Sequence, residues 1–376
     1  MTVPPPYSDG VIGNPPRYMT ERRQIFSADG DLRVVGYVFG CVVHAAGDLR
    51  VEERGAVEPG PGQVAVGIEY GGICGSDLHY YHDGGVGDFR IREPLVLGHE
   101  VVGRITGGTD GLPEGTPVGI HPATPCGQCP ECRNDRRNIC AYSNYLGSAA
   151  RNPHIQGGFV QQLIVRTDQV RILPTGLDLR TAVLAEPLSV AIHAVNQAGD
   201  VDGKRAMVTG AGPIGLLVVA ALRQAGAVEV IVTDLHETPL ALATQIGATQ
   251  TIQVGNTDWP DEIDIAIEAS GTAAGLRTCL ERVRRAGTVV QVGTLPPGDT
   301  PFAGNVLMTR ELTLRGAFRF DHEFDTAIEL LANGLNVAPI VTHTFPLDDA
   351  ATAFNLASDR TVASKVLLDL SAGTPR

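Results

Sequence analysis

The chain has 376 residues, of which 43% are hydrophobic and 19% are charged, and this length suggests a globular protein of two domains. Its formal net charge of -13 provides no basic surface for nucleic acid or for an anionic membrane, so we expect neither as a partner. The longest strongly apolar run, near residues 216–222, is far shorter than the roughly 20 residues of a membrane helix, and the N-terminus lacks the pattern of a secretory signal, so we expect a cytoplasmic protein.

Residues 1–36 form the first predicted segment. They are rich in proline, glycine and charge without sustained periodicity, and this predicts a poorly ordered N-terminal extension. In residues 37–186, short apolar alternations such as QVAVGIEY and EVVGRITGG are interrupted by glycine and proline. This punctuation is typical of a strand-rich, barrel-like domain.

The pattern changes in residues 187–319, where hydrophobic strands alternate with helical segments. The expected strands include RAMVTG, EVIVTD, IDIAIEAS and TVVQVG, and the expected helices include PIGLLVVAALRQAG and LALATQIG. Such alternation predicts a parallel, doubly wound sheet, and the fold class is therefore α/β. In residues 320–376, FDTAIELLANG reads as a helix and SKVLLDL as a strand that returns to the first domain.

A first group of metal ligands is predicted in the strand-rich domain. GGICGSDLHYY contains Cys74, and GHE at 98–100 adds His99 and Glu100. A thiolate, an imidazole and a carboxylate are the ligand types of a catalytic zinc, which keeps one position open for water or substrate. Taken singly, His99 also fits a core histidine, and Glu186 at the domain junction also fits a carboxylate at a helix N-terminus. Their joint presence with a dinucleotide motif favours the zinc site, with Glu186 near the nicotinamide.

A second group consists of four cysteines in PCGQCPECRNDRRNIC, with C-x2-C-x2-C-x7-C spacing: Cys126, Cys129, Cys132 and Cys140. Four thiolates this close together match a closed, tetrahedral zinc site that holds a loop in place. The alternatives are four free thiols or a nucleic-acid-binding zinc ribbon. The ribbon is disfavoured by the acidic charge and by the absence of two separated CxxC knuckles.

A dinucleotide site is predicted where the strand RAMVTG runs into GAGPIG. Gly210, Gly212 and Gly215 have GxGxxG spacing at a helix start, which suits a tight turn, close approach of a pyrophosphate and close packing of helix on strand. Asp234 ends the next strand, where a carboxylate binds ribose hydroxyls and repels a 2'-phosphate, so the sequence favours NAD over NADP. FAD and S-adenosylmethionine also use related folds, and Asp234 also fits an ordinary loop position.

These motifs resemble the zinc-containing medium-chain dehydrogenases, in their sorbitol dehydrogenase-like polyol branch. The resemblance covers about residues 40–370 and is carried by GGICGSDLHYY, VLGHE, PCGQCPEC, AEPLSVAIHA, VTGAGPIG, VTDL, LRGAFRF and LANG. It implies a GroES-like catalytic domain that is closed by the C-terminal segment and carries an inserted Rossmann domain. It also implies NAD as cofactor, two zinc ions per chain, and a homodimer or homotetramer.

The resemblance assigns roles to individual residues. Cys74, His99 and Glu100 would hold the catalytic zinc, and Glu186 would bind it directly or through a water. Asp77 would orient a histidine ligand from behind, and Ser76 and His79 would relay the proton of the alcohol to solvent. His79 also fits an exposed loop histidine.

Further implied contacts concern substrate and cofactor. Substrate contacts are expected at Tyr80, Glu186, Arg319 and Phe320, where an arginine suits a sugar-acid carboxylate or hydroxyl groups. Cofactor contacts are expected at Gly210, Gly212, Pro213, Ile214, Gly215, Asp234, Val292, Gly293, Thr294, Ala317, Phe318 and Arg319.

The sequence therefore predicts an NAD- and zinc-dependent dehydrogenase of a secondary alcohol in a sugar acid or polyol. L-idonate, oxidised to 5-keto-D-gluconate, is the first choice of substrate, and sorbitol, xylitol and L-threonine are alternatives. A catalytically silent binding protein is the alternative of another class; it would be expected to lack zinc ligands or a cofactor glycine, and the sequence keeps them all.

Overall fold

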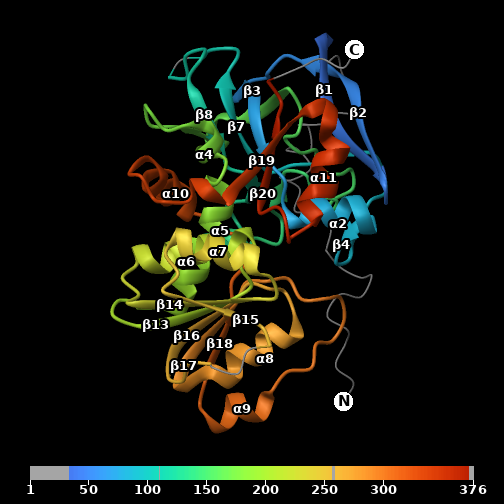
Figure 1. The fold of residues 1–376 in the computed structure, drawn as a ribbon. Helices are drawn as coiled ribbons and strands as arrows, with labels where there is room; N and C mark the ends of the chain where they lie inside the picture. Colours follow the sequence, from blue (N-terminus) through green and yellow to red (C-terminus); the bar gives the residue numbers. More distant parts are fainter. Residues whose placement is uncertain (1–33, 110, 256–258, 372–376) are drawn as a thin grey trace.

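The computed structural model describes residues 34–109, 111–255 and 259–371, which form two domains joined by the helix α5 (Ala185–Ala198) (Figure 1). The predicted N-terminal extension lies almost wholly outside the described residues, and its last three residues begin strand β1 (Val34–Ala45). No helix in the described part of the chain combines the length and the apolar character needed to cross a membrane.

The first domain is built around a seven-stranded, mostly antiparallel sheet. Six strands follow in the order β12, β8, β7, β3, β20 and β19, and β11 also pairs with β3. Their bounds are β3 (Gln63–Gly72), β7 (Glu100–Ile105), β8 (Pro117–Ile120), β11 (Gln162–Arg166), β12 (Val170–Ile172), β19 (Val341–Pro346) and β20 (Lys365–Asp369). The strand-rich character predicted for this domain is confirmed.

Smaller elements complete the first domain. A three-stranded sheet runs in the order β2 (Asp48–Val57), β1 and β6 (Leu95–Val96), and two short hairpins pair β4 (Gly85–Val86) with β5 (Phe89–Arg90) and β9 (Ala123–Thr124) with β10 (Asn144–Tyr145). The helices are α2 (Gly75–Asp83), α3 (Pro130–Arg133), α4 (Leu179–Ala182) and α11 (Ala350–Ser358), with 3-10 turns η2 (Arg137–Ile139), η3 (Thr167–Gln169), η4 (Ala338–Ile340) and η5 (Leu347–Asp349).

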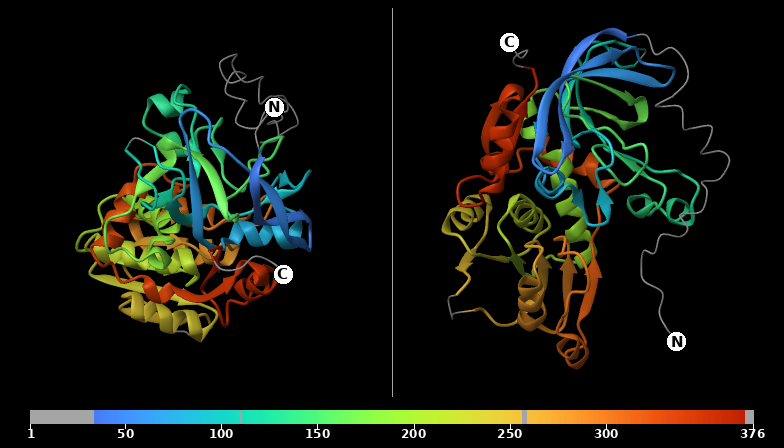
Figure 2. Two further views of the ribbon diagram at one scale, coloured as in Figure 1. Left: turned by 90° about the horizontal axis from the view of Figure 1, so that it is seen from above. Right: turned by 90° about the vertical axis from the view of Figure 1, so that its right-hand side faces the viewer.

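The last described strand belongs to the first domain, although it follows the second in sequence. In β20, Leu367 and Leu368 pair antiparallel with Gly72 and Gly71 of β3. Figure 2 shows this C-terminal segment, in red, beside the strands of the first domain. The strand thus reaches the end of β3 that leads into the Cys74 stretch, which places β20 next to the candidate site.

The second domain is a six-stranded parallel sheet in the order β15, β14, β13, β16, β17 and β18. The strands are β13 (Arg205–Thr209), β14 (Glu229–Asp234), β15 (Gln250–Gln253), β16 (Ile263–Glu268), β17 (Val283–Gln291) and β18 (Thr313–Gly316). The helices are α6 (Pro213–Gln224), α7 (Glu237–Ile246), α8 (Ala273–Arg282) and α9 (Gly304–Thr309). The helix α10 (Glu323–Ala332) follows this sheet in sequence and packs against α5 and α4, beside the first domain (Figure 1).

Helices cover both faces of this sheet. Successive residues of a strand point to opposite faces, so neighbouring residues of one strand pack against different helices. Ala206 and Val208 of β13 pack into the core formed with α5, α6 and α7, whereas Met207 packs into the core formed with α8. The predicted doubly wound sheet is therefore confirmed. β13 has β14 on one side and β16 on the other, and dinucleotides bind outside the carboxyl ends of strands at such a switch point.

Candidate active site

Cys74 lies where β3 leads into α2, and it caps the N-terminus of that helix. The buried carboxylate of Asp77 accepts hydrogen bonds from the backbone N–H of Cys74 at 3.0 Å and of Gly98 at 3.1 Å. Asp77 Oδ1 lies 3.9 Å from Nδ1 of His99, which is too long for a hydrogen bond. Asp77 thus binds the backbone next to Cys74 and His99 rather than the ring of the predicted histidine ligand.

The three predicted ligands lie together. One ligand atom each from Cys74, His99 and Glu100 lies within 4.8 Å of the others. His99 and Glu100 are buried, and the donor set of sulfur, nitrogen and oxygen suits zinc. Burial lowers the pKa of His99, but the charges of Asp77 and Cys74 outweigh burial and raise that pKa to about 10. A metal ion bound here would need the neutral imidazole and the Cys74 thiolate, so metal binding would release protons.

Glu100 has a cationic partner that the sequence reasoning missed. Nζ of the buried Lys365 on β20 donates to both carboxylate oxygens of Glu100 at 2.7 Å and to the carbonyl of Ile73 at 3.0 Å. Burial lowers the pKa of Lys365, but the attraction of Glu100 and Cys74 outweighs it and raises the pKa. The only signal in the sequence was a lysine at the start of an apolar strand.

Glu186 lies beside this group without joining it. It is buried in the first turn of α5, and its Oε1 accepts a hydrogen bond from the hydroxyl of Tyr145 at 2.6 Å. Burial raises the pKa of Glu186 to about 7, against the attraction of His99. Its carboxyl can therefore hold or release a proton near neutral pH, close to the predicted zinc ligands.

The four predicted cysteines of the second group also lie together. Their sulfur atoms all lie within 4.8 Å of one another, with Cys126–Cys132 at 4.0 Å and Cys129–Cys140 at 3.7 Å. Four thiolates at the usual zinc–sulfur distance of about 2.3 Å would be about 3.8 Å apart in a tetrahedron. Backbone N–H groups point at Sγ of Cys126 and Cys140, as thiolates require, and no cysteine forms a disulfide. These residues fit a closed zinc site.

The glycine motif starts α6 at the carboxyl end of β13. Gly210 has a positive φ of 90°, and a Cβ on Gly215 would lie 1.9 Å from the Gly210 carbonyl oxygen. A Cβ on Gly212 would meet nothing within 4 Å, so this backbone is open to a ligand. Pro213 is the first helical residue and Ile214 follows it. The three glycines therefore have the geometries that a dinucleotide turn requires.

Asp234 lies at the end of β14, beside this turn. Its carboxylate accepts hydrogen bonds from the backbone N–H of Ala211 at 2.8 Å and of His236 at 3.0 Å. The side chain therefore faces the glycine loop, where the predicted ribose contact requires it.

Glu268, at the end of β16, was also missed by the sequence reasoning. Its buried carboxylate accepts hydrogen bonds from the backbone N–H of Ser270 at 2.8 Å and of Gly271 at 3.2 Å, and its carbonyl accepts from Val292 and Gly293. Glu268 thereby ties together the loops after β16 and β17, and the predicted cofactor residue Thr294 follows Gly293. The sequence signal was an acidic residue at the carboxyl end of a core strand.

The remaining predicted contacts are dispersed. Ser76 is partly buried on α2, and His79, one turn further on, is exposed and pairs with Asp83 at 2.8 Å. Tyr80 is buried, and its hydroxyl accepts a hydrogen bond from the Ala149 backbone at 3.0 Å. Tyr80 therefore supports the loop around residue 149 rather than offering an open surface.

The segment after β18 contains both core residues and partly exposed residues. Phe320 is 2% exposed and stacks on Phe324 with ring centroids 5.8 Å apart, so the structure does not support its predicted substrate contact. The Arg319 guanidinium instead lies 4.2 Å above the ring centre of Tyr145, the residue bonded to Glu186. Ala317 bonds to the Gln291 carbonyl, and Phe318 is exposed.

The fold and these two clusters define a zinc-dependent dehydrogenase with an inserted Rossmann domain. A family model described as an alcohol dehydrogenase GroES-like domain matches residues 60–175, and one described as a zinc-binding dehydrogenase matches residues 213–333. The chain belongs to the zinc-binding dehydrogenases, so the family and the GroES-like fold predicted from the motifs are confirmed.

Individual relatives place the chain near the polyol branch. It is 40% identical to L-idonate 5-dehydrogenase (NAD(P)(+)) of Escherichia coli over 87% of this chain and 97% of that protein. It is 36% identical to sorbitol dehydrogenase of Gallus gallus over 86% and 94%. The crystal structure of the E. coli L-idonate 5-dehydrogenase superposes with a TM-score of 0.86 at 38% identity, covering 89% of this chain and 98% of that one.

Proposed function

We propose that the chain catalyses the reversible NAD-linked oxidation of a secondary alcohol in a sugar acid, converting L-idonate to 5-keto-D-gluconate. The observation that carries the proposal is the group Cys74, His99 and Glu100, whose ligand atoms lie within 4.8 Å of one another. The 40% identity to the E. coli L-idonate 5-dehydrogenase supports this choice of substrate.

The chain's own residues would handle the proton. Zinc would supply Lewis acidity that favours loss of the alcohol proton, and NAD would accept the hydride. Ser76 and His79 are three residues apart on α2, so they lie on one face of the helix. The His79 side chain is 59% exposed and so connects this face with solvent. Glu186 offers a further group that could accept or donate a proton, because burial raises its pKa to about 7.

Arg319 supports an anionic substrate. Its partly buried guanidinium contacts the rings of Tyr145 and Phe318 rather than a carboxylate, within the described part of the chain. Burial lowers the pKa of Arg319, because the charged form loses water. A substrate carboxylate would restore a charged partner for this group and accept two hydrogen bonds from it.

Sorbitol or xylitol is the alternative substrate. The 36% identity to a sorbitol dehydrogenase favours it, and Arg319 could equally donate hydrogen bonds to hydroxyl groups. A neutral polyol would leave the guanidinium without a hydrogen-bonded carboxylate, which is why we rank the sugar acid first.

The predicted assembly and location belong to the same proposal. We propose a homodimer or homotetramer, supported by the exposed edge strand β18. A cytoplasmic location is supported by the sequence, where four of seven cysteines lie within residues 126–140 and suit metal binding better than a secreted disulfide framework.

The substrate is tested with purified protein and NAD or NADP, by following absorbance of the reduced cofactor. L-idonate, D-gluconate, sorbitol, xylitol and L-threonine are compared at equal concentration. We expect the highest kcat/KM with L-idonate and NAD. A higher kcat/KM with sorbitol would transfer the assignment to the polyol, and no turnover with any of them would favour the catalytically silent alternative.

The metal site is tested with Cys74→Ser. We expect loss of turnover by at least about 100-fold, because the zinc site loses its thiolate, while NAD affinity measured by calorimetry stays near that of the wild type. Cys279→Ser makes the same substitution at a buried cysteine outside both clusters and serves as the control. Equal activity of the Cys74 variant and the control would remove zinc from the mechanism.

A further inference from the structure

Arg319 is held in a backbone conformation that an arginine does not favour. Its φ is 54°, in the left-handed region, which is unfavourable for a residue with a side chain. Such a conformation persists only where surrounding contacts hold it. The same residue carries the guanidinium stacked 4.2 Å over Tyr145, and Tyr145 in turn donates to Glu186. Whatever fixes this backbone therefore also aims the guanidinium.

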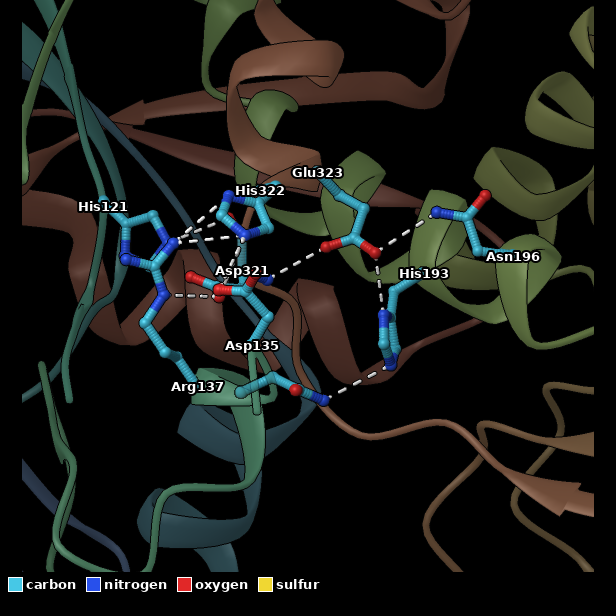
Figure 3. A network of polar contacts seen from close by, with 9 residues as sticks. His121, Asp135, Arg137, His193, Asn196, Asp321, His322 and Glu323 are labelled. Atoms are coloured by element: carbon cyan, nitrogen blue, oxygen red, sulfur yellow. Dashed lines mark hydrogen bonds and ion pairs between the residues drawn. The ribbon is translucent and has the colours of Figure 1, made fainter. Parts of the chain in front are cut away.

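The loop of the four cysteines holds the chain on both sides of Arg319. On one side, Nδ2 of Asn138 donates to the Phe318 carbonyl at 2.9 Å. On the other side, Nε of Arg137 donates to Oδ2 of Asp321 at 2.7 Å. Both donors belong to η2, which lies between Cys132 and Cys140 in sequence. Figure 3 shows Arg137 beside Asp321.

The contacts continue into α5 and α10 and form a closed network. Nδ1 of His193 lies 2.8 Å from Oε1 of Glu323, while Nε2 of His193 lies 3.3 Å from Nδ2 of Asn138. Oε2 of Glu323 accepts the backbone N–H of Asp321 at 3.0 Å. Figure 3 shows Glu323 between His193 and Asn196 of α5 and the Asp321 segment. The network thus anchors the Asp321 segment to the helix that carries Glu186.

We propose that Arg137 and Asn138 are positioning residues that fix Arg319 over Tyr145, so that the four-cysteine loop sets the aim of the substrate-facing cation. The inference rests on the proposed function, in which Arg319 meets the substrate. It assigns the loop a part in substrate recognition in addition to its local stability. Arg137 acts by pairing with Asp321, and Asn138 by holding the Phe318 carbonyl.

A double-mutant cycle of Arg137→Met and Arg319→Ala tests this assignment with the full-length, zinc-loaded enzyme. For Arg137→Met we expect kcat/KM for L-idonate to fall about tenfold, mainly through KM, because a displaced side chain loses its substrate contact. In the Arg319→Ala background, Arg137→Met should have almost no further effect, since the two residues act as a unit. Arg137→Lys, which can still pair with Asp321, should restore much of the loss.

Arg136→Met is the matched control, since Arg136 is exposed in the same loop and makes no described side-chain hydrogen bond to residues 318–323. We expect its kcat/KM to match the wild type. The melting temperature and the affinity for NAD are measured for every variant, and we expect both to be retained in the variants of Arg136 and Arg137. If the losses in kcat/KM are fully additive in the cycle, or if Arg136→Met causes an equal loss, the inference is overturned. The losses would then come from a general disturbance of the loop.

The cycle also separates this inference from the proposed function. If the wild type prefers another secondary alcohol, the cycle is run with that substrate, and non-additivity would still support the positioning role. If Arg319→Ala keeps full kcat/KM, there is no substrate contact to position, and the inference is overturned together with the proposed contact of Arg319.

Discussion

Asp234 sets the expected cofactor preference at the scale of a single residue. Its carboxylate faces the glycine loop, where it would repel a 2'-phosphate and accept hydrogen bonds from the ribose. We expect Asp234→Ala to raise the NADP-to-NAD ratio of kcat/KM by about tenfold or more, because this repulsion is lost. Steady-state kinetics with both cofactors measures the ratio.

The same substitution at the exposed Asp200 leaves the cleft unchanged and serves as its control. An unchanged cofactor ratio in Asp234→Ala would count against the ribose assignment. The E. coli relative is named for both NAD and NADP, so the test also measures how strongly one carboxylate discriminates between them.

Sequence patterns predicted the residues whose chemistry is local, and missed those whose role depends on distant partners. Cys74, His99 and Glu100 belong to short motifs, and the structure brings them together. Lys365 follows Glu100 by 265 positions, and nothing in a strand such as KVLLD states which carboxylate it meets. Phe320 shows the converse: its motif was visible in the sequence, but the motif does not state that the ring is buried in the core.

The contact between α5 and α10 makes a prediction at the scale of elements. Burial raises the pKa of Glu323, but hydrogen bonds from His193 and the backbone outweigh it and lower the pKa from 4.5 to about 2. The carboxylate therefore stabilises the fold above pH 4.5, and this contribution is lost as the pH falls towards 2. Allowing for solvent screening, we expect it to be worth roughly 2 kcal/mol.

Urea unfolding of Glu323→Gln at pH 6 and pH 3.5 measures this contribution. The variant should be less stable at pH 6 and should lose less stability on acidification than the wild type. Glu329→Gln, at an exposed position on the same helix, should keep the wild-type pH dependence. Identical pH dependence of both variants would show that Glu323 does not stabilise the junction.

The helices and strands of the second domain could be predicted because the pattern of hydrophobic residues that indicates each one lies within a short stretch of sequence. The alternation of strands and helices indicated the parallel sheet, and a buried run such as MVT in β13 is typical of one. The loop of the four cysteines was predicted as a zinc site, yet its contact with residues 318–323 was not. Arg137 and Asp321 are 184 positions apart, and only the fold brings them together.

At the scale of the whole molecule, β18 is the feature that indicates self-association. It is the last strand of the six-stranded sheet, all four of its residues are exposed, and Leu314 is 37% exposed. Phe302 and Met308, which precede β18 in sequence, are 48% and 67% exposed. An open edge with apolar side chains is a template for pairing with another strand, and a twofold axis would let two copies pair through the same edge.

We therefore expect a dimer in which two copies of β18 pair, and we expect Leu314→Lys to shift it to the monomer, because paired edges would bring two lysines together. Light scattering after size-exclusion chromatography measures the mass. Ile172→Lys is the matched control: Ile172 is 55% exposed on β12, the edge strand of the other large sheet. Dissociation by Ile172→Lys alone would move the interface to the first domain. If the wild-type protein is monomeric at micromolar concentration, the predicted dimer is wrong, and each chain would then act as an independent enzyme.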